Sequence, residues 1–128
     1  MFRILIVEDD TELCQLFSHV LEKNGYHTRM VSNGQEALDA LAEEYVDLII
    51  SDIMMPVMDG YQAARAIRGS GKKDAEMIPI IAITANAFAE DKRKTMEAGM
   101  DAHLSKPLNV QELMDTIRKF CAGKQICQ

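Results

Sequence analysis

The sequence predicts an α/β fold, a doubly wound sheet of five parallel strands in the order 2-1-3-4-5, formed by residues 1–128 as one domain. The length of 128 residues suits a single domain with its own hydrophobic core. Short, nearly continuous apolar runs alternate with amphipathic stretches of helical spacing, which is the pattern of buried parallel strands connected by helices. Such crossovers are right-handed, so the helices are expected on both faces of the sheet.

Five strands are predicted from their apolar residues, in order along the chain. Residues 2–7 (FRILIV) are apolar and rich in branched side chains, and they end at three acids, which predicts a buried strand. Residues 26–31 are more polar and alternate, as expected at a sheet edge. Two further buried strands are predicted over 46–51 and 78–83, and a short last strand over 102–105.

Five helices are predicted in the segments that follow these strands, over 10–24, 34–43, 60–69, 87–97 and 110–121. The first carries leucine, phenylalanine and valine at helical spacing and ends at Asn24-Gly25, a helix-stop signal. Gly99 is placed to end the fourth helix. Asn109 precedes the last helix and can cap it, with Glu112 three residues later in position to complete a capping box.

The composition is that of a soluble globular protein and argues against several functions. The formal net charge is -6 and the isoelectric point is near 5.0, which disfavours direct nucleic-acid binding and suits a divalent cation or a basic partner. No apolar run is long enough to cross a bilayer, so no membrane contact is expected. Cys14, Cys121 and Cys127 lack metal-ligand spacing, and a reduced, cytoplasmic chain with Cys14 in its core is the plain interpretation.

Chemically informative side chains occur where the predicted strands end. Glu8 and Asp9 follow the first strand, and Asp52 follows the third. Thr84 follows the fourth strand and Lys106 the fifth. In doubly wound sheets the binding site lies at the carboxyl ends of the strands, where the winding direction reverses. Three carboxylates, a hydroxyl and an ammonium are therefore expected to meet in one crevice.

This set of groups points to phosphoryl chemistry. Clustered carboxylates repel one another unless a cation lies among them, and oxygen ligands without His or Cys favour Mg2+ or Mn2+. The lysine and the hydroxyl suit phosphoryl oxygens, and a carboxylate is a competent nucleophile that yields an acyl phosphate. Each residue alone has a plainer explanation, with Asp10 or Thr84 as a helix cap and Lys106 as a solvated charge. Their joint placement favours a phosphoryl site with Asp52 as acceptor.

Four segments carry a family resemblance: ILIVEDD at 4–10, LIISDIMMPVMDG at 48–60, IPIIAITA at 78–85 and AGMDAHLSKPL at 98–108. Together they make the chain resemble, along essentially its whole length, a response-regulator receiver domain of two-component signalling. The run TANAFAEDKRKTMEAGMDAHLSKPL and the phrase MPVMDG look most like receivers attached to hybrid histidine kinases. The chain is thus expected to be a segment of such a kinase or a stand-alone regulator.

The resemblance implies a flavodoxin-like (βα)5 fold and a role for each strand-end residue. Asp52 would be the phosphoacceptor, and Thr84 and Lys106 would hold the phosphoryl oxygens. The metal, Mg2+, would be held by the carboxylates of Glu8, Asp9 and Asp52 and by the backbone carbonyl of Met54. The phosphoryl donor would be a phosphohistidine on a histidine kinase or a histidine phosphotransfer domain.

Further positions are implied to control the signal. In the family a strand-four threonine and a strand-five aromatic switch together, and here these positions are Thr84 and His103. A switching His103 would make the equilibrium sensitive to pH near neutrality, whereas the plainer interpretation is a half-exposed polar residue on an edge strand. Met54 and Asn86 follow Asp52 and Thr84 by two residues, where they would influence phosphoryl loss, and slow self-dephosphorylation is expected.

Three hypotheses about the function are consistent with a strand-end aspartate in this fold. The leading hypothesis is a phosphorylation-controlled switch, which is not an enzyme with a separate substrate and catalyses only its own phosphorylation and dephosphorylation. A phosphatase of the haloacid dehalogenase type would need a second acid two residues after the nucleophile, where this chain has Met54. A non-phosphorylatable interaction module of the same fold is the third hypothesis, and the presence of all the strand-end groups argues against it.

Overall fold

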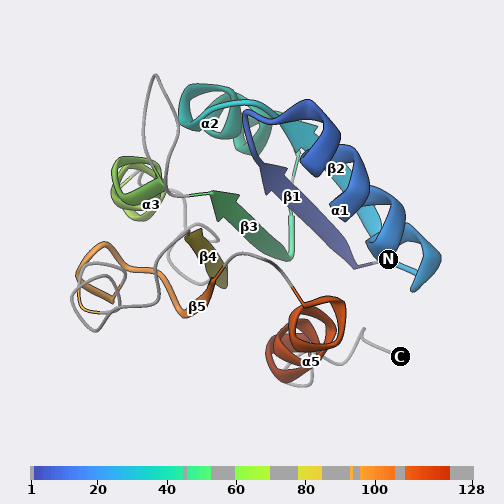
Figure 1. Cartoon of the computed structure of the whole chain (residues 1–128). Coiled ribbons are helices and arrows are strands. Elements are labelled where there is room, and N and C mark those ends of the chain that lie inside the picture. The colour runs from blue at the N-terminus through green and yellow to red at the C-terminus, as the bar shows by residue number, and fades with distance from the viewer. Residues whose placement is uncertain are drawn as a thin grey trace.

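The computed structural model describes residues 2–44, 46–52, 60–69, 78–84, 93, 96–105 and 109–121. Its strands are all parallel and form one sheet in the order β2-β1-β3-β4-β5, which confirms the predicted fold. The strands are β1 (Arg3–Val7), β2 (His27–Val31), β3 (Leu48–Asp52), β4 (Ile80–Thr84) and β5 (Ala102–Ser105). Figure 1 shows the strands side by side with helices packed around them.

The helices of the described residues are α1 (Thr11–Lys23), α2 (Gly34–Glu43), α3 (Gly60–Arg68) and α5 (Val110–Cys121). The helix predicted over 87–97 lies mostly outside the described residues, and within that range Arg93, Met96 and Glu97 are helical. In the part of the chain that the structure describes, no helix has the length and apolar character needed to span a membrane.

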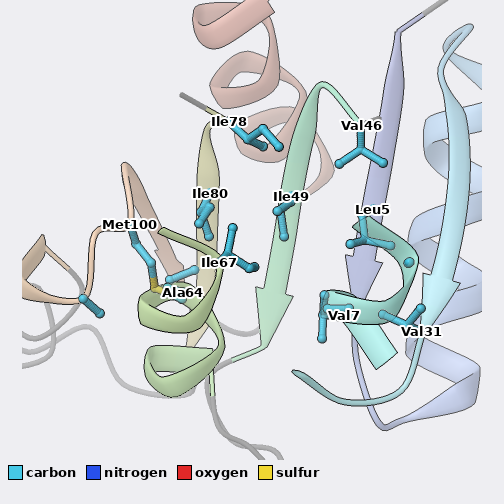
Figure 2. Close-up of a cluster of buried hydrophobic side chains, with 14 residues drawn as sticks. Leu5, Val7, Val31, Val46, Ile49, Ala64, Ile67, Ile78, Ile80 and Met100 are labelled. Atoms are coloured by element: carbon cyan, nitrogen blue, oxygen red, sulfur yellow. The ribbon is translucent and has the colours of Figure 1, made fainter. Parts of the chain in front are cut away.

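Two apolar clusters, one on each face of the sheet, form the core. Along β1, Leu5 and Val7 belong to one cluster and Ile4 and Ile6 to the other, as strand alternation requires. The first cluster packs under α2 and α3, and the second under α1 and α5 (Figure 1). In Figure 2 the α3 residue Ile67 lies among the side chains of the first cluster. Burial on both faces explains why the inner strands β1, β3 and β4 are mostly apolar, whereas the edge strand β2 is more polar.

The strands β3 and β4 begin two residues later than predicted, and each ends one residue later. The strand predicted over 46–51 is Leu48–Asp52 because the buried Asp47 bonds to Arg3 partly through its side chain. The Asp47 N–H donates to the Arg3 carbonyl (2.8 Å), and an Asp47 carboxylate oxygen accepts the Arg3 N–H (2.8 Å). The strand predicted over 78–83 begins at Ile80, since Pro79 has no N–H to donate. At its other end β3 continues to Asp52, which pairs with Ile83 of β4, so Asp52 is part of the strand.

Capping residues explain why α1 is one residue shorter at each end than predicted. The Asp10 carboxylate accepts the Leu13 N–H (3.2 Å), so the plainer interpretation of this acid as a helix cap is confirmed. After the C-cap Asn24, Gly25 turns the chain with φ +91°. Asn109 likewise accepts the Glu112 N–H (3.0 Å) at the start of α5. The predicted ranges of β1 and β2 begin one residue too early, at 2 and 26, and the predicted range of α3 ends one residue too late, at 69.

Candidate functional site

The carboxyl ends of β1 and β3 bring acids from distant parts of the chain together. The two strands are parallel neighbours, and Val7 at the end of β1 pairs with Ser51 of β3. Glu8 and Asp52 are the next residues along the two chains, so they lie at the same edge of the sheet. The Glu8 N–H donates to the Val31 carbonyl (3.1 Å) and extends the pairing of β1 with β2 by one residue. The backbone of Glu8 is therefore held by the sheet.

Glu8, Asp9 and Asp52 form an acid cluster at this edge. One carboxylate oxygen from each residue lies within 4.8 Å of those of the other two. Glu8 is 2% exposed and Asp52 4%, whereas Asp9 is exposed. Negative charges this close and this shielded repel one another, and the repulsion is relieved by a cation between them or by protonation. The convergence expected from the strand ends is thus present for all three acids.

The donor atoms of the acid cluster fit a hard divalent cation. Oxygens on opposite sides of one octahedral Mg2+ lie about 4 Å apart, since each Mg–O bond is about 2.1 Å. Three oxygens within 4.8 Å of one another can therefore all become ligands of one such ion with small side-chain movements. The cluster contains no nitrogen or sulfur donor, which favours Mg2+ or Mn2+ over zinc. One exposed acid beside two buried ones also leaves a side of the cluster open to solvent.

Cys14 of α1 is buried, in agreement with the expected core position. Burial, and secondarily the negative charge of Glu8, raises the pKa of the Cys14 thiol to about 11. The thiol is therefore protonated near neutral pH, and a protonated thiol is neither a good metal ligand nor a nucleophile.

We predict that native Cys14 reacts slowly with thiol reagents. In a Cys121→Ser/Cys127→Ser variant the rate at pH 8 should be at least about 100-fold below that of the same chain in denaturant, because two pKa units lower the thiolate fraction by that factor. A colorimetric thiol assay with and without denaturant measures the ratio. Equal rates in the two conditions would contradict the burial argument.

Thr84 ends β4 at the same edge as the acids. Ile83 pairs with Asp52, and Thr84 pairs with Ser105 at the end of β5. The backbone of Thr84 is thus one residue beyond the partner of Asp52, as the strand-end argument expects. Lys106 follows Ser105 directly in the sequence. Lys106, Met54, Asn86 and the side chain of Thr84 lie outside the described part of the molecule.

His103 lies in the middle of β5, opposite Ala82 of β4. Its side chain is half-buried, and its Nε2 atom is shielded from solvent. Strand alternation directs it away from Leu104, which is buried in the cluster under α1 and α5. His103 is therefore two strand positions from the edge that carries the acids, and its intermediate exposure on an edge strand agrees with the plainer interpretation of a half-exposed polar residue.

A second polar group, formed by Arg68 and Asp101, lies at the amino-terminal edge of the sheet. The two residues were not identified from the sequence. Their side chains form an ion pair (2.8 Å) although they are 33 residues apart in the chain. A weak sequence signal is present, since an arginine ends a helix and a Gly-x-Asp run directly precedes a strand. Such a signal is too common to identify a contact by itself.

Comparison with known proteins agrees with this geometry. The family described as response regulator receiver domain matches residues 4–118. The chain is 37% identical over 117 residues to the sensor histidine kinase RcsC of Escherichia coli (strain K12). The matched region covers 91% of this chain but only 12% of RcsC. It is 35% identical over 119 residues to the polar-differentiation response regulator DivK of Brucella ovis, covering 91% of the chain and 94% of DivK.

Among solved structures, the receiver domain of the sensor histidine kinase PA1611 from Pseudomonas aeruginosa PAO1 is similar, with a TM-score of 0.85 and 33% identity. The match covers 94% of this chain and 98% of that domain, which has a magnesium ion coordinated in its active site cleft. A doubly wound parallel sheet with acids at its carboxyl edge is the architecture of a receiver domain. The chain belongs to the response regulator receiver domain family of two-component signalling.

Proposed function

We propose that the chain accepts a phosphoryl group on Asp52 in a Mg2+-dependent reaction and signals through the resulting change of conformation. The observation that carries this proposal is the acid cluster, in which carboxylate oxygens of Glu8, Asp9 and Asp52 lie within 4.8 Å of one another. The magnesium ion in the cleft of the related PA1611 domain supports the choice of metal. Bound there with the Met54 carbonyl as a further ligand, Mg2+ would neutralise the carboxylates and the phosphoryl oxygens.

The transfer itself needs a nucleophile and a donor. An oxygen of the Asp52 carboxylate forms the new bond to phosphorus, and the phosphorus–nitrogen bond to the donor imidazole breaks. The electron pair of that bond returns to the imidazole nitrogen, which takes a proton from solvent. Asp52 is suited to this role because it is the last residue of β3, where it pairs with Ile83 of β4, and the preceding Ser51 pairs with Val7 of β1. Thr84 and Lys106 would hold two of the phosphoryl oxygens.

The partner in this proposal is a histidine kinase or a histidine phosphotransfer domain that supplies a phosphohistidine. Relatives of both architectures support it, since the chain spans 12% of the sensor kinase RcsC and 94% of the response regulator DivK. The proposal therefore holds for a segment of a hybrid kinase as well as for a stand-alone regulator. The proposed partners do not include nucleic acid or a membrane.

We also propose that His103 acts with Thr84 as the conformational switch. The half-buried position of His103 on β5 supports this, because a residue shielded by neighbouring elements can report a change in their packing. The phosphorylation-induced chemical shift changes of wild type and His103→Phe should diverge between pH 6 and pH 8, where imidazoles commonly titrate. Parallel behaviour of the two proteins over that range would remove the pH-sensitive role.

Met54 and Asn86 complete the proposal as residues that set the lifetime of the acyl phosphate. Met54 has no polar group that could orient an attacking water, so slow loss of the phosphoryl group is expected. Decay of the phosphorylated protein, followed by mass spectrometry, should accelerate when Met54 is replaced by a residue that can orient water, such as Met54→Asn. A decay within seconds in wild type, slowed by Asn86→Ala, would contradict the shielding role of Met54.

The main test is incubation with Mg2+ and acetyl phosphate, followed by intact-mass spectrometry. A single phosphoryl adduct is expected in wild type, and none in Asp52→Asn or after the metal is removed with a chelator. Asn keeps the size and hydrogen-bonding capacity of the side chain while removing the nucleophilic charge. Continuous release of phosphate over many turnovers would instead indicate a phosphatase, and the absence of any adduct would indicate an interaction module.

A further inference from the structure

A polar cluster at the amino-terminal edge of the sheet, opposite the acid cluster, joins α3 to the start of β5. Arg68 is the last residue of α3. Its Nη1 donates to the Ile78 carbonyl (2.7 Å), and its Nη2 and Nε donate to the Gly99 carbonyl (2.7 and 3.0 Å). Nη2 also donates to Oδ2 of Asp101 (2.8 Å). Arg68, Ile78, Gly99 and Asp101 are called the Arg68 clamp below.

Asp101 connects the clamp to β4. Its Oδ2 accepts the N–H of Ile80 (2.9 Å), and its own N–H donates to the Ile80 carbonyl (2.8 Å). Both backbone groups of the first residue of β4 are thus bound to the residue that precedes β5. Hydrogen bonds from a guanidinium to carbonyl and carboxylate oxygens are charge-assisted and belong to the stronger class. The side chain of Arg68 is only 20% exposed, so water competes little with these bonds.

Gly99 is required by the clamp for two reasons. Its φ of +90° lies in the left-handed region that favours glycine. A Cβ built on Gly99 would lie 3.0 Å from Cγ of Arg68, which is closer than most real Cβ contacts, so the arginine side chain would have to shift by a few tenths of an ångström. The turn before β5 and the arginine that binds it therefore fit one another.

The clamp matters because the register of β5 is otherwise weakly determined. β5 is an edge strand of four residues, and Leu104 is its single large buried side chain. A slip by one residue would exchange the faces of Leu104 and His103 and is opposed by burial. A slip by two residues keeps each side chain on its face but moves the end of the strand by about 7 Å. Alternation alone does not exclude this second slip, whereas the two bonds between Asp101 and Ile80 do.

We propose that Arg68 is a positioning residue for the phosphoryl site, because it holds β5 in the register that pairs Ser105 with Thr84, and Ser105 is the residue from which the chain continues into Lys106. The inference rests on the proposed function only in taking Lys106 as a phosphoryl ligand. The three acids lie at the ends of β1 and β3, and the hydrogen bonds of the Arg68 clamp described above involve neither strand. The clamp should therefore affect phosphoryl transfer and leave metal binding unchanged.

The test compares Arg68→Lys with Arg65→Lys. Both variants keep the positive charge on α3, but Arg65 is exposed and lies outside the clamp. Mg2+ affinity is measured by calorimetry and the phosphorylation rate with saturating acetyl phosphate. For Arg68→Lys we expect an unchanged Mg2+ affinity, within twofold, and a rate lowered by about tenfold or more, since a misplacement of about 1 Å can cost on the order of a hundredfold. Arg65→Lys should match wild type in both.

A Lys106→Met background separates positioning from general loosening. If Arg68 acts through Lys106, adding Arg68→Lys to Lys106→Met lowers the rate by less than twofold further, because the two changes remove the same interaction. An undiminished loss in that background, a matching loss of Mg2+ affinity, or an Arg68→Lys rate equal to that of Arg65→Lys would each overturn the proposal.

A register measurement keeps the inference separate from the proposed function. Backbone amide shifts and hydrogen exchange of Thr84 and Ser105 should change in Arg68→Lys and remain as in wild type in Arg65→Lys. If wild type accepts no phosphoryl group, the proposed function fails, yet these amides still decide whether Arg68 sets the register. Unchanged exchange at both residues in Arg68→Lys would falsify the register role.

Discussion

Replacing Asp9 with asparagine is expected to raise the melting temperature of the metal-free protein and to weaken Mg2+ binding at least tenfold. The carboxylate oxygens of Glu8, Asp9 and Asp52 lie within 4.8 Å of one another, so removing one charge relieves repulsion in the folded state. The same change removes one ligand from the metal. Wild type should gain roughly 2.7 kcal/mol of stability when Mg2+ reaches a hundred times its Kd, and Asp9→Asn should gain much less at that concentration.

Thermal unfolding with and without Mg2+ measures both effects. Asp10→Asn is the matched control, because Asp10 is adjacent, carries the same charge and caps α1 without belonging to the acid cluster. Asparagine is as good a helix cap as aspartate, so this control keeps the hydrogen bond to Leu13. If the two variants shift the melting temperature equally and respond equally to Mg2+, net charge rather than the acid cluster explains the result.

Among the substitutions proposed here, Ile50→Ala is expected to lower the free energy of unfolding the most, by about 3 to 4 kcal/mol. The loss comes from the buried side-chain atoms that are removed and from the cavity that remains. Ile50 is 1% exposed and lies on β3, two residues before Asp52. For a chain of this length the melting temperature should fall by about 10 °C or more. Ile50→Val removes one methylene group and should cost only about 1 kcal/mol.

Chemical denaturation measured by circular dichroism gives the free energy of unfolding of each variant. Leu16→Ala serves as the control, because Leu16 of α1 is 54% exposed and its truncation should change stability by less than about 0.5 kcal/mol. A cost for Leu16→Ala equal to that for Ile50→Ala would mean that apolar content rather than burial determines the loss. Mg2+ affinity of Ile50→Ala, measured well below its melting temperature, reports whether the position of Asp52 survives the cavity.

Much of the fold could be predicted from the sequence because its signals are local. The inner strands β1, β3 and β4 are mostly apolar since both faces of the sheet are buried there, and this is visible in the run FRILIV, whereas the edge strand β2 is more polar. The helix ends at Asn24-Gly25 and the cap at Asn109 follow from the conformations those residues favour. The start of β3 could not be predicted this way, because it depends on a bond between the Asp47 carboxylate and Arg3, 44 residues away.

The order of strands and helices could be predicted from the residues alone, and so could the meeting of Glu8, Asp9 and Asp52 at one edge, since parallel neighbours end together. The burial of Glu8 and Asp52 beside an exposed Asp9 could not, because burial depends on every element packed around the edge. The partners of Arg68 likewise became known from the folded structure, since charge and helix position allow many alternatives. Periodicity is encoded by residues close in the chain, whereas a contact across 33 residues exists only once the sheet has placed both partners.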